Sequence, residues 1–247
     1  MVRGASSVVA LTGAGVSTGA GIPDFRGPRG LYVTRRYDPE LVFSIDHFMR
    51  DARMFYEFTR DFVAMVKGLK PTLTHRALAL LEERGILAGV ITQNIDALHH
   101  HAGSKTVVEV HGSYWSATCT RCRTPVPEAR SYSWWEEAIR SSPASPVVLC
   151  RACAGVVKPG VVFFGEAVRD FEEATRLVEG CDLLFVLGSS LAVHPAALLP
   201  ELAHGQVVVV NRGSVALAPA PNRYFVDEDL DRYFERLLER LGLPLPA

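Results

Sequence analysis

The chain has 247 residues and a net charge of −1 at pH 7, with 48% hydrophobic and 21% charged residues, an ordinary composition for a globular protein. This balance offers no basic surface for nucleic acid or an anionic membrane, and we expect neither as a partner. No apolar run reaches the roughly 18 residues of a transmembrane helix. The amino terminus lacks the regions of a signal peptide, so we expect a cytoplasmic location.

Apolar runs of strand length recur along the chain and are nearly continuous, as in parallel strands buried on both faces. We expect strands at residues 7–11, 88–92, 106–110, 161–164, 183–187 and 207–210. Helical patterns separate several of them. One runs from Thr74, a good N-cap, to Arg84 and closes at Gly85, and another spans 227–241. The alternation predicts an α/β fold with a doubly wound, Rossmann-like parallel sheet.

Two segments interrupt this alternation. Residues 40–68 carry an apolar face at helical spacing, and residues 113–157 contain paired cysteines and a Ser/Pro-rich stretch. We expect residues 1–39, 69–112 and 158–247 to form the Rossmann-like domain. The helical insertion 40–68 and the zinc-binding module 113–157 would together form a smaller domain.

The cysteines predict a metal site. Four of the five fall into two Cys-x-x-Cys pairs, a pattern that in a cytosolic protein indicates metal ligands. We expect one structural Zn²⁺ per chain, held tetrahedrally with no open position for a substrate. It would hold together a module too small for its own core. The ligands would be Cys119, Cys122, Cys150 and Cys153, whereas Cys181 is interpreted as a small buried hydrophobe.

A glycine-rich turn, Gly13 to Gly15, follows the first predicted strand. Such a turn lets backbone N–H groups approach a pyrophosphate, although alone it is weak evidence and favours a plain tight turn. Thr18 stands where the dehydrogenase fingerprint has its third glycine, which disfavours an ordinary dehydrogenase. The next loop adds Arg26, which suits a phosphate, and Phe25, which suits an aromatic ring or a reactive sugar carbon.

Small or polar residues also follow four later predicted strands. Because the carboxyl ends of parallel strands form the edge where such sheets bind ligands, these groups suit a dinucleotide. The segments are Gln93 to Asp96, His111 to Gly112, Gly188 to Ser190, and Asn211.

Taken in order, these motifs resemble those of the sirtuin family. They are Gly-Ala-Gly-Val-Ser at 13–17, Gly-Ile-Pro-Asp-Phe-Arg at 21–26, Thr-Gln-Asn-Ile-Asp at 92–96, His-Gly at 111–112, the paired cysteines, Phe-Phe-Gly-Glu at 163–166 and Gly-Ser-Ser-Leu at 188–191. The resemblance covers about Val8 to Asn211. Within the family, the chain is similar to bacterial and archaeal members. It implies an NAD-dependent protein-lysine deacylase that consumes NAD as a co-substrate.

The resemblance also implies a role for each motif. The residues at 94–96 would line the nicotinamide pocket, and those at 189, 190 and 211 would hold the adenosine half. The set implied for NAD is Gly13, Ala14, Gly15, Thr18, Asp24, Phe25, Arg26, Tyr32, Gln93, Asn94, Ile95, Asp96, His111, Gly188, Ser189, Ser190, Asn211 and Leu230.

Catalysis would depend on His111 and Asn94. In sirtuins the acyl oxygen attacks the ribose and expels nicotinamide, and a histidine then acts as general base on a ribose hydroxyl. The products are free lysine and O-acyl-ADP-ribose. An acyl-lysine protein or peptide would add as a strand between two loops. The implied contacts are Val162, Phe164, Gly165, Glu166, Leu191 and Val193.

Alternatives remain at this point. A mono-ADP-ribosyltransferase would use the same NAD site, and residue types hardly separate it from a deacylase. A zinc-ribbon nucleic-acid binder would need a basic surface around the cysteines, yet acidic residues offset the arginines there. Without the resemblance, His111 would be interpreted as a core histidine at the end of a strand. The run His99 to His101 is interpreted as a solvated helix and not as a metal site, because consecutive helical residues point in different directions.

The acyl group is expected to be neutral. Sirtuins that prefer succinyl- or malonyl-lysine resemble one another in a Tyr-x-x-Arg pattern on the helical module. Here Tyr56 is present, but Thr59 occupies the arginine position, and Arg60 comes one residue later.

Overall fold

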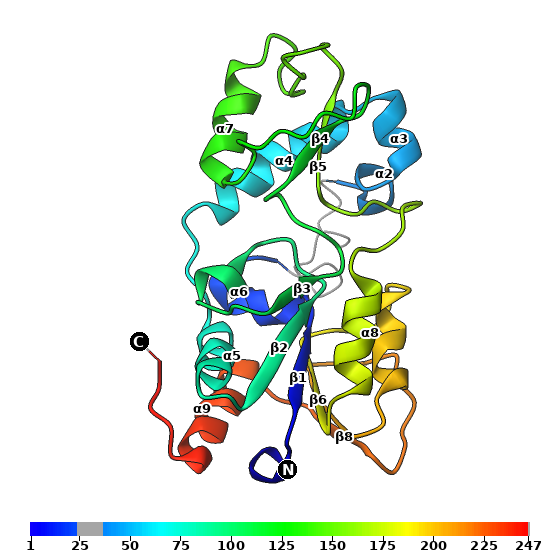
Figure 1. The fold of residues 1–247 in the computed structure, drawn as a ribbon. Helices are drawn as coiled ribbons and strands as arrows, with labels where there is room; N and C mark the ends of the chain where they lie inside the picture. Colours follow the sequence, from blue (N-terminus) through cyan, green and yellow to red (C-terminus); the bar gives the residue numbers. More distant parts are fainter. Residues whose placement is uncertain (24–36, 247) are drawn as a thin grey trace. The chain divides into compact units, whose positions relative to one another are not determined.

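The computed structural model describes residues 1–23 and 37–246. It contains a six-stranded, fully parallel sheet in the order β3-β2-β1-β6-β7-β8 (Figure 1). The strands are β1 (Val8–Thr12), β2 (Leu87–Thr92), β3 (Val107–Glu109), β6 (Leu183–Leu187), β7 (Gln206–Val210) and β8 (Arg223–Val226). The strand order reverses between β1 and β6, as in a doubly wound fold. The predicted α/β class is therefore confirmed.

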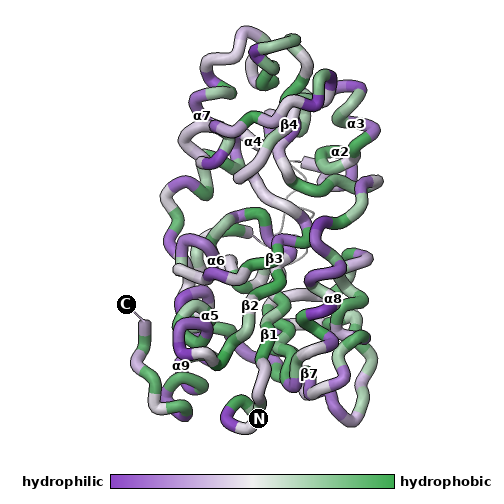
Figure 2. The backbone as a smooth tube through the Cα atoms, viewed as in Figure 1, coloured by the Kyte–Doolittle hydropathy of each residue, from purple (hydrophilic) through white to green (hydrophobic). Residues whose placement is uncertain are grey.

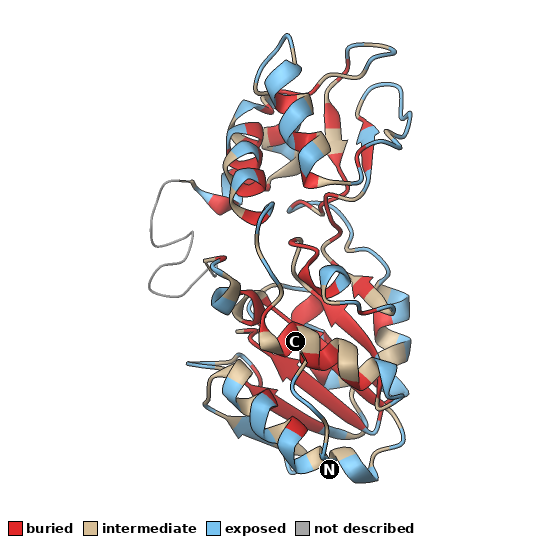
Figure 3. Cartoon of the chain, turned by 90° about the vertical axis from the view of Figure 1, so that its left-hand side faces the viewer, coloured by how far each residue is buried: buried red, intermediate tan, exposed pale blue. Residues whose placement is uncertain are grey.

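Helices cover both faces of the sheet because successive strand residues point to opposite sides. Val9 and Leu11 pack with α8 (Phe171–Glu179) and η3 (Ala196–Leu202). Val8 and Ala10 pack on the other face with α5 (Leu73–Glu83) and α9 (Leu230–Leu241). The central strands are apolar and buried along their length (Figures 2 and 3). Three short elements complete this part, η1 (Val2–Gly4), η2 (Ala14–Ala20), which begins within the glycine motif, and α6 (Leu98–His101).

The chain divides into two compact units. Unit 1 comprises residues 1–21, 70–110 and 168–247 and contains the parallel sheet. Unit 2 comprises residues 22–69 and 111–167. Its elements are α2 (Pro39–Val42), α3 (Ile45–Arg50), α4 (Arg53–Val66), the antiparallel pair β4 (Ala117–Cys119) and β5 (Val157–Pro159), and α7 (Tyr132–Ser141).

An aromatic cluster forms the core of unit 2. The ring of Phe163 lies 4.8 Å from that of Phe55 and 5.2 Å from that of Phe48, between ring centroids. Phe43 contacts the same cluster, with its centroid 6.0 Å from that of Phe163. These apolar side chains explain why the predicted helical segment 40–68 folds against the loop that follows β5.

Several sequence-based predictions are wrong in detail. Residues 161–164 do not form a strand; Phe164 makes a single parallel bridge to Ser44 instead. Thr74 is not an N-cap, because helix α5 begins two residues earlier and Thr72 caps it by accepting a hydrogen bond from the backbone of His75. Thr74 instead donates its hydroxyl to Asp231 at 2.6 Å.

Two further features of unit 1 differ from expectation. Strand β8 was not predicted, because it is short, lies at the sheet edge and exposes Tyr224 and Phe225. The helix at 99–101 is not solvated throughout, since His99 is only 2% exposed. Cys181 is buried, as expected.

Across residues 1–23 and 37–246, no helix is long and apolar enough to cross a membrane.

Candidate active site

The glycine turn after β1 lies directly against the end of β6. The N–H of Gly13 donates to the Leu187 carbonyl at 2.9 Å, and the N–H of Gly15 donates to the Gly188 carbonyl at 2.8 Å. A Cβ on Gly15 would stand 2.6 Å from the Gly188 Cα, and one on Gly13 would stand 2.8 Å from the Gly188 oxygen. No side chain fits at either glycine, so the backbone of Gly13 and Gly15 packs directly against the strand end where the strand order reverses.

Asn94 is fixed beside this turn. Its Nδ2 donates to the Gly13 carbonyl at 3.1 Å and to the Ser17 hydroxyl at 3.2 Å. Ser17 in turn donates to Asp96 at 2.6 Å, and the other Asp96 oxygen accepts from the Leu98 N–H at 2.9 Å. Burial raises the pKa of Asp96, while the Ser17 hydrogen bond opposes that shift. The network locks the segment 93–96 to the glycine turn.

A second group of polar residues follows strands β2, β6 and β7. Gln93 donates its side-chain amide to the Ser189 hydroxyl at 3.0 Å, which also accepts from the Leu191 N–H. Ser190 accepts at its carbonyl from the Ala216 N–H at 2.9 Å. Asn211, after β7, donates to the carbonyl of Arg212 at 3.0 Å. Residues predicted from three separate motifs thus meet at one edge of unit 1.

The remaining unit 1 residues of the predicted site differ in how far they are exposed. Thr18 is exposed and donates its hydroxyl to the Gly15 carbonyl at 3.0 Å. Leu230 packs partly buried against the sheet core at the start of α9. Leu191 is 1% exposed, so it has only backbone to offer a peptide. The Val193 carbonyl accepts from the Ala197 N–H at 3.0 Å.

His111 and the predicted peptide loop belong to unit 2. His111 is half-buried, and its carbonyl accepts from the Val162 N–H at 2.8 Å. Phe164 is 47% exposed, while its neighbour Phe163 is buried in the aromatic core. Gly165 has a φ of +95°, a left-handed conformation that favours glycine.

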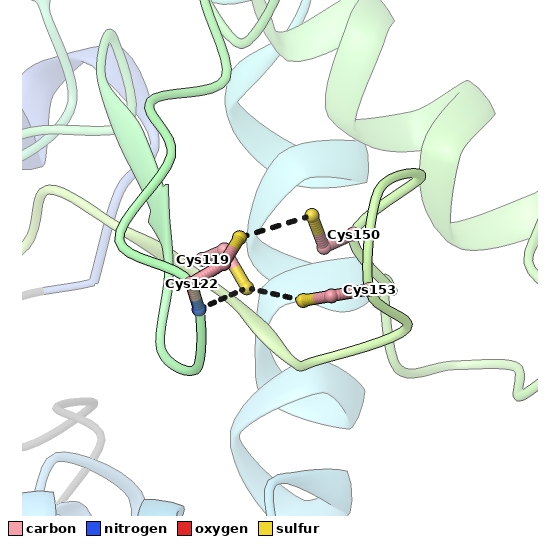
Figure 4. A group of neighbouring side chains, drawn as sticks. All are labelled: Cys119, Cys122, Cys150 and Cys153. Atoms are coloured by element: carbon pink, nitrogen blue, oxygen red, sulfur yellow. Dashed lines mark hydrogen bonds between the residues drawn. The ribbon is translucent and has the colours of Figure 1, made fainter.

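The four paired cysteines converge in unit 2 (Figure 4). Their sulfur atoms all lie within 4.8 Å of one another, with Cys119 and Cys153 at 3.5 Å and Cys122 and Cys150 at 3.8 Å. A tetrahedral zinc with Zn–S bonds of about 2.3 Å requires S···S separations of about 3.8 Å. The donor set and its spacing therefore fit a zinc ion.

The two cysteine pairs have the same local backbone geometry. Arg123 and Ala154 each follow the second cysteine of a pair, with φ values of +60° and +54°. Each donates its N–H to the carbonyl of the first cysteine, Arg123 to Cys119 at 3.0 Å and Ala154 to Cys150 at 2.8 Å. Such matched turns aim both thiols of a pair at one point.

The electrostatics of the cluster also favour a cation. The Thr124 hydroxyl and backbone N–H lower the pKa of Cys122 to about 6. Although the Gly155 N–H opposes the shift most strongly, burial and the neighbouring thiols raise the pKa of Cys153 to about 11. Four thiols so close together cannot all ionise near neutral pH unless a cation compensates their charge.

Some predicted site residues lie outside the described residues, namely Asp24, Phe25, Arg26 and Tyr32. Conversely, sequence reasoning gave no role to Ser17, although it joins Asn94 to Asp96. Its place in the glycine motif was visible, but the pairing of two motifs 79 residues apart was not.

Comparisons with known proteins agree with this geometry. A sequence model described as the Sir2 family matches residues 13–195, more than half of the chain. An NAD-dependent protein deacetylase of Thermotoga maritima is 40% identical over 240 residues, covering 95% of this chain and 93% of that protein. An NAD-dependent protein deacylase of Aeropyrum pernix is 38% identical over 245 residues, covering 96% and 93%.

Solved structures agree as well. A Sir2 bound to an acetylated peptide superposes with a TM-score of 0.84 at 36% identity, covering 98% of this chain and 96% of that one. A Sir2 complex with a deacetylated peptide and 3′-O-acetyl-ADP-ribose has a TM-score of 0.87 at 38% identity, with 98% and 96% covered. With relatives this similar over nearly their whole length, the chain belongs to the Sir2 family.

Proposed function

We propose that this chain is an NAD-dependent protein-lysine deacetylase, which transfers the acetyl group of acetyl-lysine to ADP-ribose and releases nicotinamide. The observation that carries the proposal is the Asn94 carboxamide, held by Gly13 and Ser17 beside a turn in which Gly13 and Gly15 carry no side chain. The activities for which the Thermotoga and Aeropyrum relatives are named support the same reaction.

The residues present at the edge of unit 1 fit NAD. The glycines at 13, 15 and 188 let the turn pack closely against the end of β6, as in the glycine-rich turns that receive a pyrophosphate. We assign Ser189, Ser190 and Asn211 to the adenosine side, and Asn94, Ile95 and Asp96 to the nicotinamide side. Unit 1 is thus the proposed NAD-binding domain, and unit 2 the proposed small domain.

When bound, NAD supplies the ribose carbon to which the acyl oxygen adds as nicotinamide leaves. Asn94 contributes orientation, because two hydrogen bonds through Nδ2 fix the direction of its carbonyl oxygen. His111 is the proposed general base, and one of its imidazole nitrogens takes up the proton of a ribose hydroxyl. An imidazole suits this role because its ordinary pKa lies near neutrality.

The peptide and the metal have separate proposed places. Acyl-lysine peptides would bind by backbone pairing to Gly165 and Glu166 of unit 2, with Val162 and Phe164 lining the acyl-lysine site. The four cysteines would hold one zinc ion that has no substrate position and only stabilises unit 2.

One incubation tests the reaction. An acetyl-lysine peptide, NAD and the protein are mixed, and the products are identified by mass spectrometry. The proposal expects a peptide lighter by one acetyl group, free nicotinamide and O-acetyl-ADP-ribose. An ADP-ribosylated peptide that keeps its acetyl group would instead establish a mono-ADP-ribosyltransferase. Omitting NAD from a parallel sample must abolish deacetylation.

A further inference from the structure

We propose that Lys158 is a positioning residue that holds the loop 161–166 in the shape that receives the acyl-lysine peptide. The inference rests on the proposed function, since it concerns the loop assigned to the peptide. It adds a role for a residue that lies in β5, before the loop, and that is not assigned to any contact with substrate.

The Lys158 ammonium is largely buried and has several partners within the loop. The side chain is 14% exposed. Its Nζ donates to the Val161 carbonyl at 2.7 Å and lies 2.9 Å from a carboxylate oxygen of Glu166. It also stands 4.1 Å from the centroid of the Phe163 ring. One cation therefore touches the beginning, middle and end of the loop.

Glu166 extends this contact to the loop backbone. The same oxygen that faces Lys158, Oε2, accepts from the Phe163 N–H at 2.8 Å. The Glu166 N–H donates to the Phe163 carbonyl at 2.9 Å. The turn from 163 to 166 is thus closed by two hydrogen bonds, and one of them uses a carboxylate whose charge Lys158 neutralises.

The opposite edge of the loop is attached to the link between α2 and α3. The Phe164 N–H donates to the Phe43 carbonyl at 2.7 Å, and the Phe164 carbonyl accepts from the Ile45 N–H at 3.1 Å. A Cβ on Gly165 would stand 2.9 Å from Ile45 Cγ2. With one edge bonded in this way, Lys158 determines whether the other edge keeps its shape.

A preformed loop lowers the entropy that a peptide must lose when it binds as a strand. Replacing Lys158 with methionine keeps much of the side-chain volume but leaves the Glu166 carboxylate and the Val161 carbonyl without their cation. Arginine retains the charge and the contact with an aromatic ring, so it should restore most of the effect.

Amide hydrogen exchange of the free protein tests the positioning directly. We expect Lys158→Met to speed exchange at residues 163–166 by about tenfold or more, and Lys158→Arg to remain close to wild type. Lys67→Met is the matched control, because Lys67 pairs with Glu136 at 2.5 Å in the same unit but does not contact the loop. Unchanged exchange in Lys158→Met would overturn the proposal.

Kinetics then connect the loop to the peptide. Lys158→Met should raise the KM for the acetyl-lysine peptide by about tenfold while kcat and the KM for NAD change less than about twofold. A fall in kcat as large as the fall in kcat/KM for the peptide, or a raised KM for NAD, would show a general structural role instead. If Lys158→Met does not fold, Glu166→Gln weakens the same contact and must produce the same exchange and KM changes.

The two readouts separate the two claims. Exchange is measured without peptide or NAD, so it reports on Lys158 even if the wild type proves inactive. An inactive wild type whose loop is still loosened by Lys158→Met would refute the deacetylase proposal and not the fixation of the loop by Lys158. A loop that Lys158→Met leaves protected in an active enzyme would refute the positioning role alone.

Discussion

His75 and His99 lie with their imidazole rings 4.6 Å apart, between centroids, in the core of unit 1. His99 Nε2 is 2.9 Å from the hydroxyl of Thr12, the residue before the glycine turn. His75 Nδ1 is 2.7 Å from the hydroxyl of Thr72, which donates to the Val16 carbonyl at the other end of that turn. The pair therefore supports both ends of the proposed NAD-binding turn.

This pair predicts a loss of stability in mild acid. Burial lowers the pKa of His75 to about 3 and lowers that of His99 as well. The unfolded chain binds protons at these histidines below about pH 6.5, whereas the folded chain does not. The free energy of unfolding is thus unaffected by these two histidines above about pH 6.5. Below that pH it falls by about 1.4 kcal/mol per pH unit for each histidine.

Urea unfolding between pH 5 and 8 measures this effect. We expect the wild-type free energy of unfolding to fall as pH decreases from 6.5 to 5, and His75→Gln to show a shallower slope. The exposed His204→Gln is the control and should keep the wild-type slope. His100 acts in the opposite sense, because Glu109 raises its pKa, but it is half-exposed and the effect is screened. A pH-independent free energy over this range would contradict the assignment.

The contact between the glycine turn and β6 predicts the effect of a single methyl group. Gly15→Ala would place a Cβ 2.6 Å from the Gly188 Cα, and backbone on both sides must move. We expect NAD affinity to fall by about tenfold or more and stability to fall by about 1–3 kcal/mol. Gly4→Ala is the control, since a Cβ there meets nothing within 4 Å. Calorimetric titration with NAD gives the comparison, and equal dissociation constants for both variants would count against this turn as the NAD site.

Removing one thiol should release the metal. We expect about one zinc per wild-type chain by elemental analysis, and a loss of most of it in Cys122→Ser. The melting temperature should fall by about 5 °C or more, because the metal-bound state supplies part of the folding free energy of unit 2. Cys181→Ser, which changes a buried thiol outside the cluster, should keep its zinc. A wild-type protein purified without zinc would overturn this prediction.

The general-base role predicts a selective defect. His111→Ala should reduce deacetylation by about 10²–10⁴-fold while NAD binding and the melting temperature stay near wild type. The measurements are nicotinamide release, NAD titration and thermal unfolding on one preparation. His204→Ala controls for loss of an exposed imidazole. More than about a tenth of wild-type activity in His111→Ala would exclude the role.

The fold class was predictable because buried parallel strands leave continuous apolar runs, as at 183–187. The cysteine cluster was predictable because a tetrahedral thiolate site constrains residue type and spacing at once. Both signals are local, so one sequence suffices to find them.

Pairings between distant segments were not predictable. Nothing near residue 163 indicates that its loop bonds to Phe43 and Ile45 and not to a neighbouring strand. The burial of His99 depends on packing against His75 and Thr12, which no helical period reveals. Threonine is a good N-cap residue at both 72 and 74, and the local sequence does not show that Thr72 caps the helix while Thr74 bonds to Asp231.

Acyl selectivity follows from three neighbouring positions on α4. Tyr56 is fully buried and donates its hydroxyl to the Val157 carbonyl, so it is already engaged within unit 2. Thr59 is also fully buried, with its hydroxyl 3.1 Å from that of Tyr114.

Arg60 cannot replace the missing arginine. Its side chain is 56% exposed and lies beside Asp61. One residue on a helix is a rotation of about 100°, which aims Arg60 away from the side that Thr59 faces.

A succinyl carboxylate entering the proposed site beside Val162 and Phe164 would therefore lose water without the arginine of the Tyr-x-x-Arg pattern as its partner, at a cost of several kcal/mol. A neutral acetyl group carries no such cost. We expect kcat/KM for an acetyl-lysine peptide to exceed that for the same peptide with succinyl-lysine by about tenfold or more, a difference of about 1.4 kcal/mol. Arg60→Ala is the matched test and should leave this ratio unchanged. Equal or reversed values in the wild type, or a ratio that shifts in Arg60→Ala, would mean that an arginine does reach the acyl end.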